Sequence, residues 1–212
     1  VGENITAGKL LRNNFYFDQQ DLDRVFLKKK NKLRATLKYE FEKYYQIDGG
    51  IEFYDADNLP YYNNPDSSGF FEVFTSDATS WDIFLNMLYH LGPYGYFYGS
   101  VNYLNIQDPD SRKVPYYPGL KASLIYGYDF SQDWKSEFKL SYLSDRYADI
   151  ENSDERKLQS IFYLGLKISY TIQQNMGAFI EINNILNTKM SVWEGYQEEP
   201  IDVLVGFNYF FD

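Results

Sequence analysis

Aromatic side chains beside polar residues are the feature of this sequence best suited to binding a ligand. They stand in long polar segments: Tyr61 and Tyr62, Phe70 and Phe71, Tyr116 and Tyr117, and Trp193 with Tyr196. Each aromatic ring offers an apolar face, and a tyrosine hydroxyl or indole N–H adds a polar handle, which suits an amphipathic ligand. We therefore name these eight residues as candidates for ligand-binding loops. The alternative is that they only pack within the loops or at an interface.

Catalytic groups are scarce. His90 is the single histidine and there is no cysteine, which excludes multi-histidine metal sites, thiolate zinc sites, disulfides and cysteine nucleophiles. His90 stands beside the turn Leu91–Pro93, where an exposed rim position is the simplest interpretation. The sequence predicts no enzyme activity and no bound cofactor.

Carboxylates cluster in three of the polar segments, at 108–110, 149–155 and 198–199. Oxygen ligands suit calcium, but none of these segments has the spacing of a known calcium loop. Solvated loop charge is the simpler interpretation, and a bridge through divalent cations to lipopolysaccharide phosphates is a second one. The formal net charge of −10 excludes a broad attraction to nucleic acid.

The elements that position these residues are β-strands, because apolar and polar residues alternate with a period of two. From Leu33 to Phe41, for example, every second residue is apolar and the residues between them are Arg34, Thr36, Lys38 and Glu40. The pattern predicts about ten strands. They are Ile5–Phe17, Lys32–Lys43, Gly49–Asp57, Ser80–His90, Tyr94–Ile106, Gly119–Phe130, Trp134–Tyr147, Gln159–Ile172, Met176–Asn184 and Ile201–Phe211, with Phe70–Phe74 as an extra strand or an extension of a neighbour.

Short turns and long polar connections alternate along the chain, as they do in outer-membrane barrels. No run of about 18 apolar residues occurs, which excludes a helical membrane protein but not a barrel. Mid-strand charges such as Lys38, Lys139 and Lys167 would be costly in a sealed apolar core, whereas a polar lumen can hydrate them. The sequence therefore predicts an all-β, antiparallel transmembrane β-barrel with its apolar face turned to lipid. A soluble all-β binding module is the alternative.

The segment from Tyr94 to Asp212 resembles the last strands of a TonB-dependent outer-membrane receptor. The residues that carry the resemblance are Val101–Ile106, Val114–Pro118, Tyr142–Tyr147, the run Glu181–Lys189 and the C-terminal Val205–Phe211. The run Glu181–Lys189, with its Asn-Asn-Ile-Leu-Asn core, is the most specific of these. The alternating Phe207, Tyr209 and Phe211 resemble the terminal signal that the barrel assembly machinery reads, although the last residue here is Asp212.

The resemblance implies a receptor that binds a scarce extracellular ligand (a metal chelate, a cofactor or a glycan) and imports it when a TonB-type protein pulls a plug domain. Barrels of this family have about 22 strands, and this sequence supplies about ten with no plug-like segment. We therefore expect residues 1–212 to be a barrel segment in the bacterial outer membrane, with both chain ends periplasmic. An autonomous ten-stranded barrel with a structural, adhesion or small-pore role is the alternative.

Overall fold

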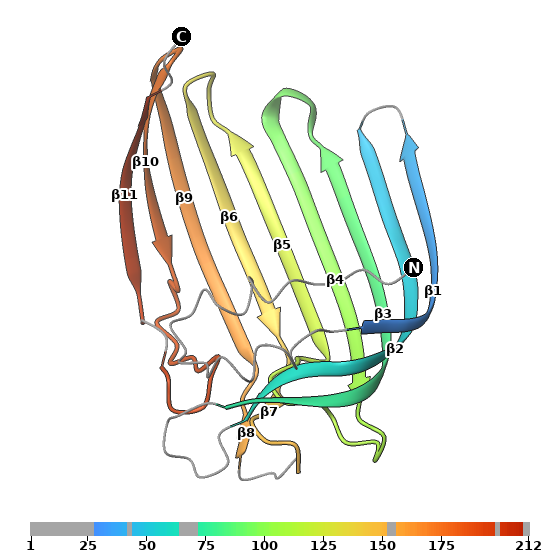
Figure 1. The fold of residues 1–212 in the computed structure, drawn as a ribbon. Helices are drawn as coiled ribbons and strands as arrows, with labels where there is room; N and C mark the ends of the chain where they lie inside the picture. The colour runs from blue at the N-terminus through green and yellow to red at the C-terminus, as the bar shows by residue number, and fades with distance from the viewer. Residues whose placement is uncertain (1–27, 42–43, 64–71, 152–155, 198–199, 210–212) are drawn as a thin grey trace.

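A nine-stranded antiparallel sheet dominates the computed structural model, which describes residues 28–41, 44–63, 72–151, 156–197 and 200–209 (Figure 1). The strands pair in the order in which they follow along the chain. They are β1 (Lys28–Phe41), β2 (Tyr45–Asn63), β3 (Glu72–His90), β4 (Gly95–Gln107), β5 (Leu120–Asp129), β6 (Trp134–Leu143), β9 (Ile161–Gln173), β10 (Met176–Asn183) and β11 (Asp202–Tyr209). Two short strands, β7 (Arg146–Tyr147) and β8 (Lys157–Leu158), form a separate hairpin. Among the described residues, no helix is long and apolar enough to cross a membrane.

One face of the sheet is an aliphatic band edged by aromatic rings. On β3 the exposed residues of this face run from Trp81 through Ile83, Leu85 and Met87, and Tyr89 follows. The same eight-residue interval separates two aromatic residues on three other strands, at Tyr45–Phe53, Trp134–Tyr142 and Phe162–Tyr170. Eight steps of about 3.3 Å, tilted by roughly 40°, give a band about 20 Å high. We call this the outer face.

The opposite face, here called the inner face, carries polar side chains that bond across the strands. Glu52 lies 3.4 Å from the Lys32 ammonium and 3.5 Å from the Arg34 guanidinium. On the neighbouring strands the Asn86 amide donates to Asp48 at 3.0 Å. Carboxylates in the middle of the sheet are thereby paired on the wall itself, which offsets the cost of removing them from water.

The two ends of the sheet differ in the way the sequence predicts. Short turns join the strands at one end, including the 3-10 turn Gly92–Tyr94, and long connections gather at the other (Figure 1). At the long-loop end, β2 and β3 continue past the wall and pack on residues of the other loops. The buried cluster there consists of Tyr54, Ala56, Leu59, Tyr61, Ala78, Ile106 and Val114. We call this end the loop cap; it comprises residues 58–63, 72–79, 108–119, 144–151, 156–160 and 184–197.

Nine of the ten predicted strands are confirmed, and Ile5–Phe17 lies outside the described residues. The predicted ends of the strands at Asp57 and Ser80 were wrong, since β2 runs on to Asn63 and β3 starts at Glu72. The alternative that Phe70–Phe74 extends a neighbouring strand is confirmed for Glu72–Phe74, which belong to β3. A bulge between Ala56 and Leu59, with Asn58 at φ 53°, bends the hairpin and disguised its continuity. The predicted strand Trp134–Tyr147 is broken after Leu143, where β7 leaves the wall.

The predicted start of the third strand at Gly49 was also wrong, because the corresponding strand β2 begins at Tyr45 and includes Gly49 and Gly50. Gly50 lies under its neighbours: a Cβ there would stand 2.6 Å from the Ala35 carbonyl oxygen and 2.9 Å from Thr36 Cγ2. The glycine pair therefore permits close approach of strands rather than a turn.

We expect Gly50→Val to destabilise the protein by about 1–3 kcal/mol, because backbone rather than a mobile side chain blocks the new methyl groups. The measurement is urea unfolding of the purified protein in detergent. Gly99→Val on β4 is the matched control, since a Cβ at Gly99 meets nothing within 4 Å. Equal losses in both variants would contradict this reason, because a Cβ at Gly99 has no close neighbour.

Candidate functional site

The loop cap brings together six of the eight aromatic residues proposed as ligand-binding candidates. The ring of Trp193 lies 4.9 Å from that of Tyr62, edge to face, and 4.7 Å from that of Tyr116. Tyr61 stacks on Phe74 at 5.9 Å, and Tyr117 packs against the buried cluster. Burial raises the pKa of Tyr117 to about 12.

These rings mostly pack against one another, which favours the loop-packing interpretation for Tyr61 and Tyr62, each only 9% exposed. Tyr196 is the exposed member, and its backbone bridges to Trp193. Phe70 and Phe71 lie outside the described residues. The ligand-binding role of the eight aromatic residues stays a prediction.

Two arginines join separate loops of the cap. Arg146, 3% exposed, donates to the carbonyl oxygens of Ser191 at 2.6 Å and Val192 at 3.2 Å. Burial lowers its pKa. Arg156 donates to Glu194 from two nitrogens, and this hydrogen bonding raises the pKa of the guanidinium. The segment 191–194 is therefore tied to the β7–β8 hairpin.

The acidic segments have structural partners where they are described. Asp108, 4% exposed, accepts hydrogen bonds from the backbone N–H groups of Asp110 and Arg112 and from the Arg112 side chain. Glu151 lies 3.6 Å from Arg112. Within the described ranges, no group of three acidic or histidine side chains could hold a metal ion.

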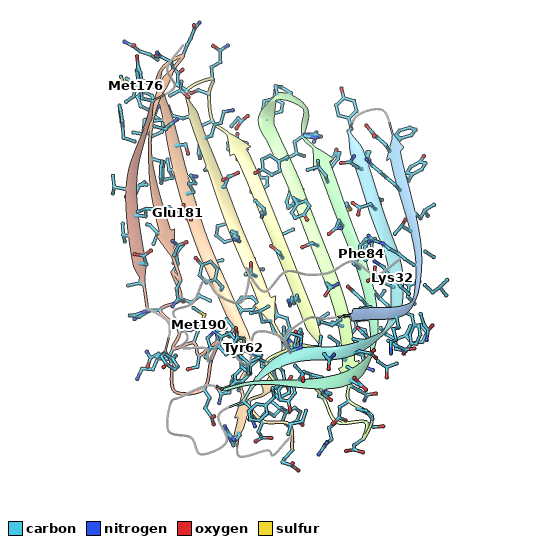
Figure 2. All side chains as sticks on the ribbon, in the orientation of Figure 1. Lys32, Tyr62, Phe84, Met176, Glu181 and Met190 are labelled. Atoms are coloured by element: carbon cyan, nitrogen blue, oxygen red, sulfur yellow. The ribbon has the colours of Figure 1, made fainter. Side chains whose placement is uncertain are left out.

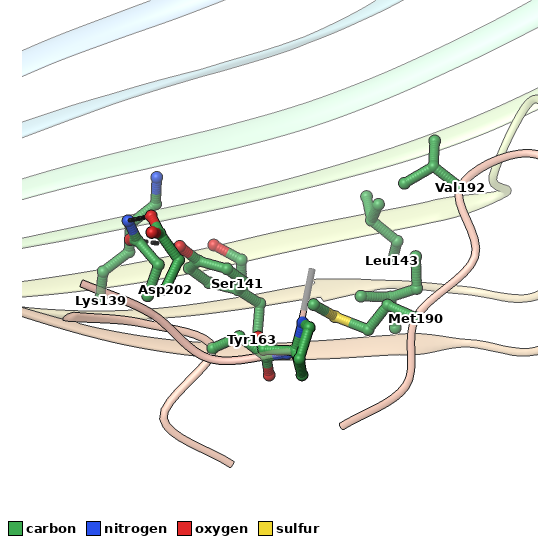
Figure 3. Close-up of a pocket in the computed structure, with 11 residues that line it drawn as sticks. Lys139, Ser141, Leu143, Tyr163, Met190, Val192 and Asp202 are labelled. Atoms are coloured by element: carbon green, nitrogen blue, oxygen red, sulfur yellow. Dashed lines mark hydrogen bonds between the residues drawn. The ribbon is translucent and has the colours of Figure 1, made fainter. Parts of the chain in front are cut away.

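A hollow of about 750 Å³ lies between the inner face and residues of the connection after β10, namely Asn184, Met190, Val192 and Pro200 (Figure 3). Its apolar end is formed by Leu143, Met190 and Val192, and its polar end includes Lys139 and Asp202. Asp202 accepts a hydrogen bond at 3.3 Å from Asn183, which in turn accepts one from the Tyr163 hydroxyl. Figure 2 shows Met190 and Tyr62 at the loop end of the sheet, so the apolar end of the hollow lies at the loop cap.

A second hollow of about 580 Å³ adjoins the first, because Ser141 and Leu143 line both. It extends along the inner face across β6, β5, β4, β3 and β2 to β1, where Arg34 and Glu52 close it. Phe84 and Tyr98 give this hollow aromatic surface, and Asn86 and Asn102 give it amides. The residues around the two hollows form one continuous surface on the inner face, with both apolar and polar side chains.

Sequence reasoning missed most of this lining. The sequence alone identifies only polar positions of alternating strands at Lys139, Ser141, Tyr163 and Asn183. The available signal was the alternation along each strand. Each of these residues follows or precedes an apolar residue of the outer face, so its own side chain must point to the inner face. No signal in the sequence pairs Met190 and Val192 with the wall, since Arg146 fixes that loop from a distant segment.

The remaining predicted residues lie away from the hollows. His90 is exposed at the short-turn end of β3, and its backbone N–H donates to Tyr44. Phe207 and Tyr209 are exposed on the outer face of β11, and Phe211 lies outside the described residues.

Arg146→Met should loosen the segment 188–197, because it leaves buried carbonyl groups without a donor, at a cost of about 1–3 kcal/mol. Hydrogen exchange of the amides in this segment is the measurement. The exchange rate should rise by the factor that corresponds to this loss of free energy. Arg112→Met is the control, since Arg112 pairs with Asp108, Asp110 and Glu151 in other loops. Unchanged exchange in Arg146→Met would show that the aromatic contacts of Trp193 hold the segment alone.

Comparison with solved structures assigns the fold. No family model and no curated protein sequence matches the chain. Similar structures are the ferric-catecholate import receptor Fiu of E. coli K12 (TM-score 0.68, 15% identity, 99% of this chain), the copper transporter OprC (0.73, 15%, 93%) and the siderophore receptor PiuA of Acinetobacter baumannii (0.67, 12%, 87%). This chain spans about a third of their lengths, at 32%, 34% and 28%. The chain has the fold of part of an outer-membrane receptor barrel, and the predicted resemblance to TonB-dependent receptors is confirmed as a likeness of fold.

Proposed function

We propose that this chain forms part of the wall of an outer-membrane receptor that binds a scarce extracellular ligand and imports it. The observation that carries the proposal is the two-sided sheet: an aromatic-edged aliphatic face opposite a polar face with two connected hollows. The proposed ligand classes are a metal chelate, a cofactor or a glycan. Fiu is an import receptor, OprC a copper transporter and PiuA a siderophore receptor by name, and the likeness of fold supports the same kind of role here.

The outer face argues for lipid rather than water as its solvent. Leu37 is 76% exposed and Val205 is 73% exposed, and each belongs to a band that continues over all nine strands. Monomeric soluble proteins rarely expose an apolar patch above a few hundred Å². This face therefore disfavours the soluble binding module.

The sheet edges argue for a wall that other strands complete. Within the residues that the structure describes, β1 pairs only with β2 and β11 pairs only with β10, so the sheet is open. Unsatisfied backbone groups are not tolerated in lipid, and a barrel must close. The autonomous ten-stranded barrel would need its own edges to meet, which the described sheet does not do.

The proposed orientation follows from the two ends of the sheet. Short turns face the periplasm and the loop cap faces outward, as in other outer-membrane barrels. The C-terminal strand β11 then ends on the periplasmic side, and Phe207, Tyr209 and Phe211 are the proposed signal to the barrel assembly machinery. A periplasmic N-terminus requires the tenth predicted strand, Ile5–Phe17, which lies outside the described residues. Lipid and lipopolysaccharide surround the wall, and a TonB-type protein acts through a plug of the whole receptor.

The test is uptake by the source bacterium with and without the gene for the whole protein. We expect the protein in the outer-membrane fraction, and we expect deletion to lower uptake of at least one of four probes: a ferric catecholate, copper(II), cobalamin or a neutral oligosaccharide. A protonophore should abolish that uptake, because import is energy-coupled. Unchanged uptake of all four probes after deletion, or a protein found outside the outer membrane, would overturn the proposal.

Neighbouring residues on opposite faces supply a second prediction. Val101→Arg places a cation in the aliphatic band and should destabilise the protein by about 2–4 kcal/mol in lipid vesicles. Ser100→Arg places the same charge in the hollow on the inner face, where water reaches it, and should cost much less. Urea unfolding from vesicles measures both, and a reversed order would mean that the two faces have been assigned the wrong way round.

A further inference from the structure

Two lysine ammonium groups lie over the ring of one tyrosine in the loop cap. The Nζ atoms of Lys113 and Lys157 are 6.0 Å and 5.6 Å from the centroid of the Tyr147 ring, close enough for cation–π attraction. The Asp145 carboxylate pairs with the Lys157 ammonium at 2.7 Å. A hydrogen bond from Lys157 and the charge of Lys113 hold the pKa of Asp145 below its ordinary value. We call these four residues the rim cluster; it carries two cations and one carboxylate.

The β7–β8 hairpin turns the rim cluster away from the packed interior of the loop cap. Tyr147 pairs with Lys157 and Arg146 pairs with Leu158, so the two pairs lie on opposite faces of the hairpin. Arg146 is buried and donates to carbonyl oxygens of the segment 191–192. The face that carries Tyr147 and Lys157 is therefore the outward one.

Lys113 lies on the outer side of the wall as well. It forms an antiparallel bridge with Gln107, and the neighbour of Gln107, Ile106, belongs to the buried cluster. Because side chains alternate along β4, Gln107 shares the outer face with the exposed Tyr103. Lys113 itself is exposed, whereas Val114 beside it is buried with Ile106.

The height of the rim cluster matches that of lipid headgroups. Tyr103, on the loop side of the exposed Val101, marks the aromatic edge of the aliphatic band on β4, and Gln107 stands four residues beyond it. Four steps of about 3.3 Å, tilted by roughly 40°, raise Gln107 about 10 Å above that edge. The headgroups add roughly 5–8 Å on each side of the hydrocarbon core. A lysine at this height on the lipid side reaches the phosphate groups of membrane lipids.

Other charged groups at this end of the sheet have more carboxylates than cations. At β1 and β2, Lys30 pairs with Asp57, and the Asn31 amide donates to Asp55 at 3.0 Å. In the loop that follows β4, Arg112 pairs with three carboxylates. Of these three groups, only the rim cluster has an excess of cations, so an anion is attracted there and repelled by the other two.

We propose that the rim cluster binds the phosphate group of an anionic lipid in the outer leaflet of the membrane. The proposal rests on the outer-membrane location proposed above, because the cluster needs a bilayer beside it. Lys113 and Lys157 donate to the phosphate oxygen atoms, and Asp145 holds the Lys157 ammonium in place. A hollow of about 90 Å³, lined in part by Lys113, Asp145 and Tyr147, leaves room for such a group. The contact is direct and needs no divalent cation.

The experiment is native mass spectrometry of the full-length protein in a non-ionic detergent, titrated with lipid A that carries its phosphates. Lipid A without phosphates and inorganic phosphate are titrated in parallel, and a chelator is present throughout. We expect the phosphorylated lipid to bind in the chelator and the other two probes to bind much more weakly. Lys113→Gln and Lys157→Gln should each weaken binding about fivefold, the loss of one cation at a membrane surface, and the double variant should weaken it about 25-fold.

Lys30→Gln is the matched control, since Lys30 lies at the same end of the sheet and pairs with Asp57. It should change affinity less than twofold, and the double arginine variant of Lys113 and Lys157 should retain binding. All variants should keep the heat-modifiable migration of a folded barrel.

Equal losses in Lys30→Gln and Lys113→Gln would overturn the proposal, because general charge rather than the rim cluster would then attract the lipid. Equal binding of lipid A with and without phosphates would also overturn it, as would binding that the chelator abolishes. Inorganic phosphate that displaces the lipid at an equal concentration would mean that the site takes a soluble anion instead. Each of these results leaves the receptor function standing, since uptake tests that function separately. A protein found outside the outer membrane would overturn both proposals.

Discussion

Hydrogen bonding between neighbouring strands is the constraint on which the rest of this structure depends. Nine strands pair in sequence order, so each backbone group inside the sheet is satisfied by the next strand. The register then assigns every side chain to one of two faces, and a slip of one residue would exchange the faces. The aromatic-edged band and the polar hollows are therefore consequences of one register. Only the open edges, β1 and β11, leave backbone groups without a described partner strand.

The loop cap depends on a different kind of interaction. There the backbone leaves the sheet, and side chains satisfy it instead: Arg146 donates to carbonyl oxygens of the segment 191–192, and Asp108 accepts from the N–H groups of its own loop. Arg156 and Glu194 add a partly buried ion pair between two loops. Aromatic rings fill the space between these contacts. The result is a packed unit at one end of the wall, which fixes the loop that closes the first hollow.

The sequence predicted what is local and periodic, and it missed what joins distant segments. The alternation from Leu33 to Phe41 is visible within nine residues and was enough to assign a strand and its faces. The pair Gly49 and Gly50 led to a wrong predicted start of β2, because glycine occurs both in turns and where strands approach closely. Pro60 and Asn58 disguised the continued hairpin, since the bulge they flank is fixed by pairing with β3. No local pattern predicts that Trp193 contacts Tyr62 and Tyr116, because several strands of the wall separate these residues along the chain.

The inner face divides into two regions by how its polar groups are satisfied. Toward β1 the wall is self-contained: Glu52 has Lys32 and Arg34, and Asp48 has Asn86. Toward β4, β5 and β6 the hydroxyls of Ser100, Ser123 and Ser141 line the hollows instead. A charged pair on a wall sets the local field but has little left to offer a ligand, because its strongest hydrogen bonds are already made. The contribution of hydroxyls to the binding of a ligand grows with the number that one ligand engages at once.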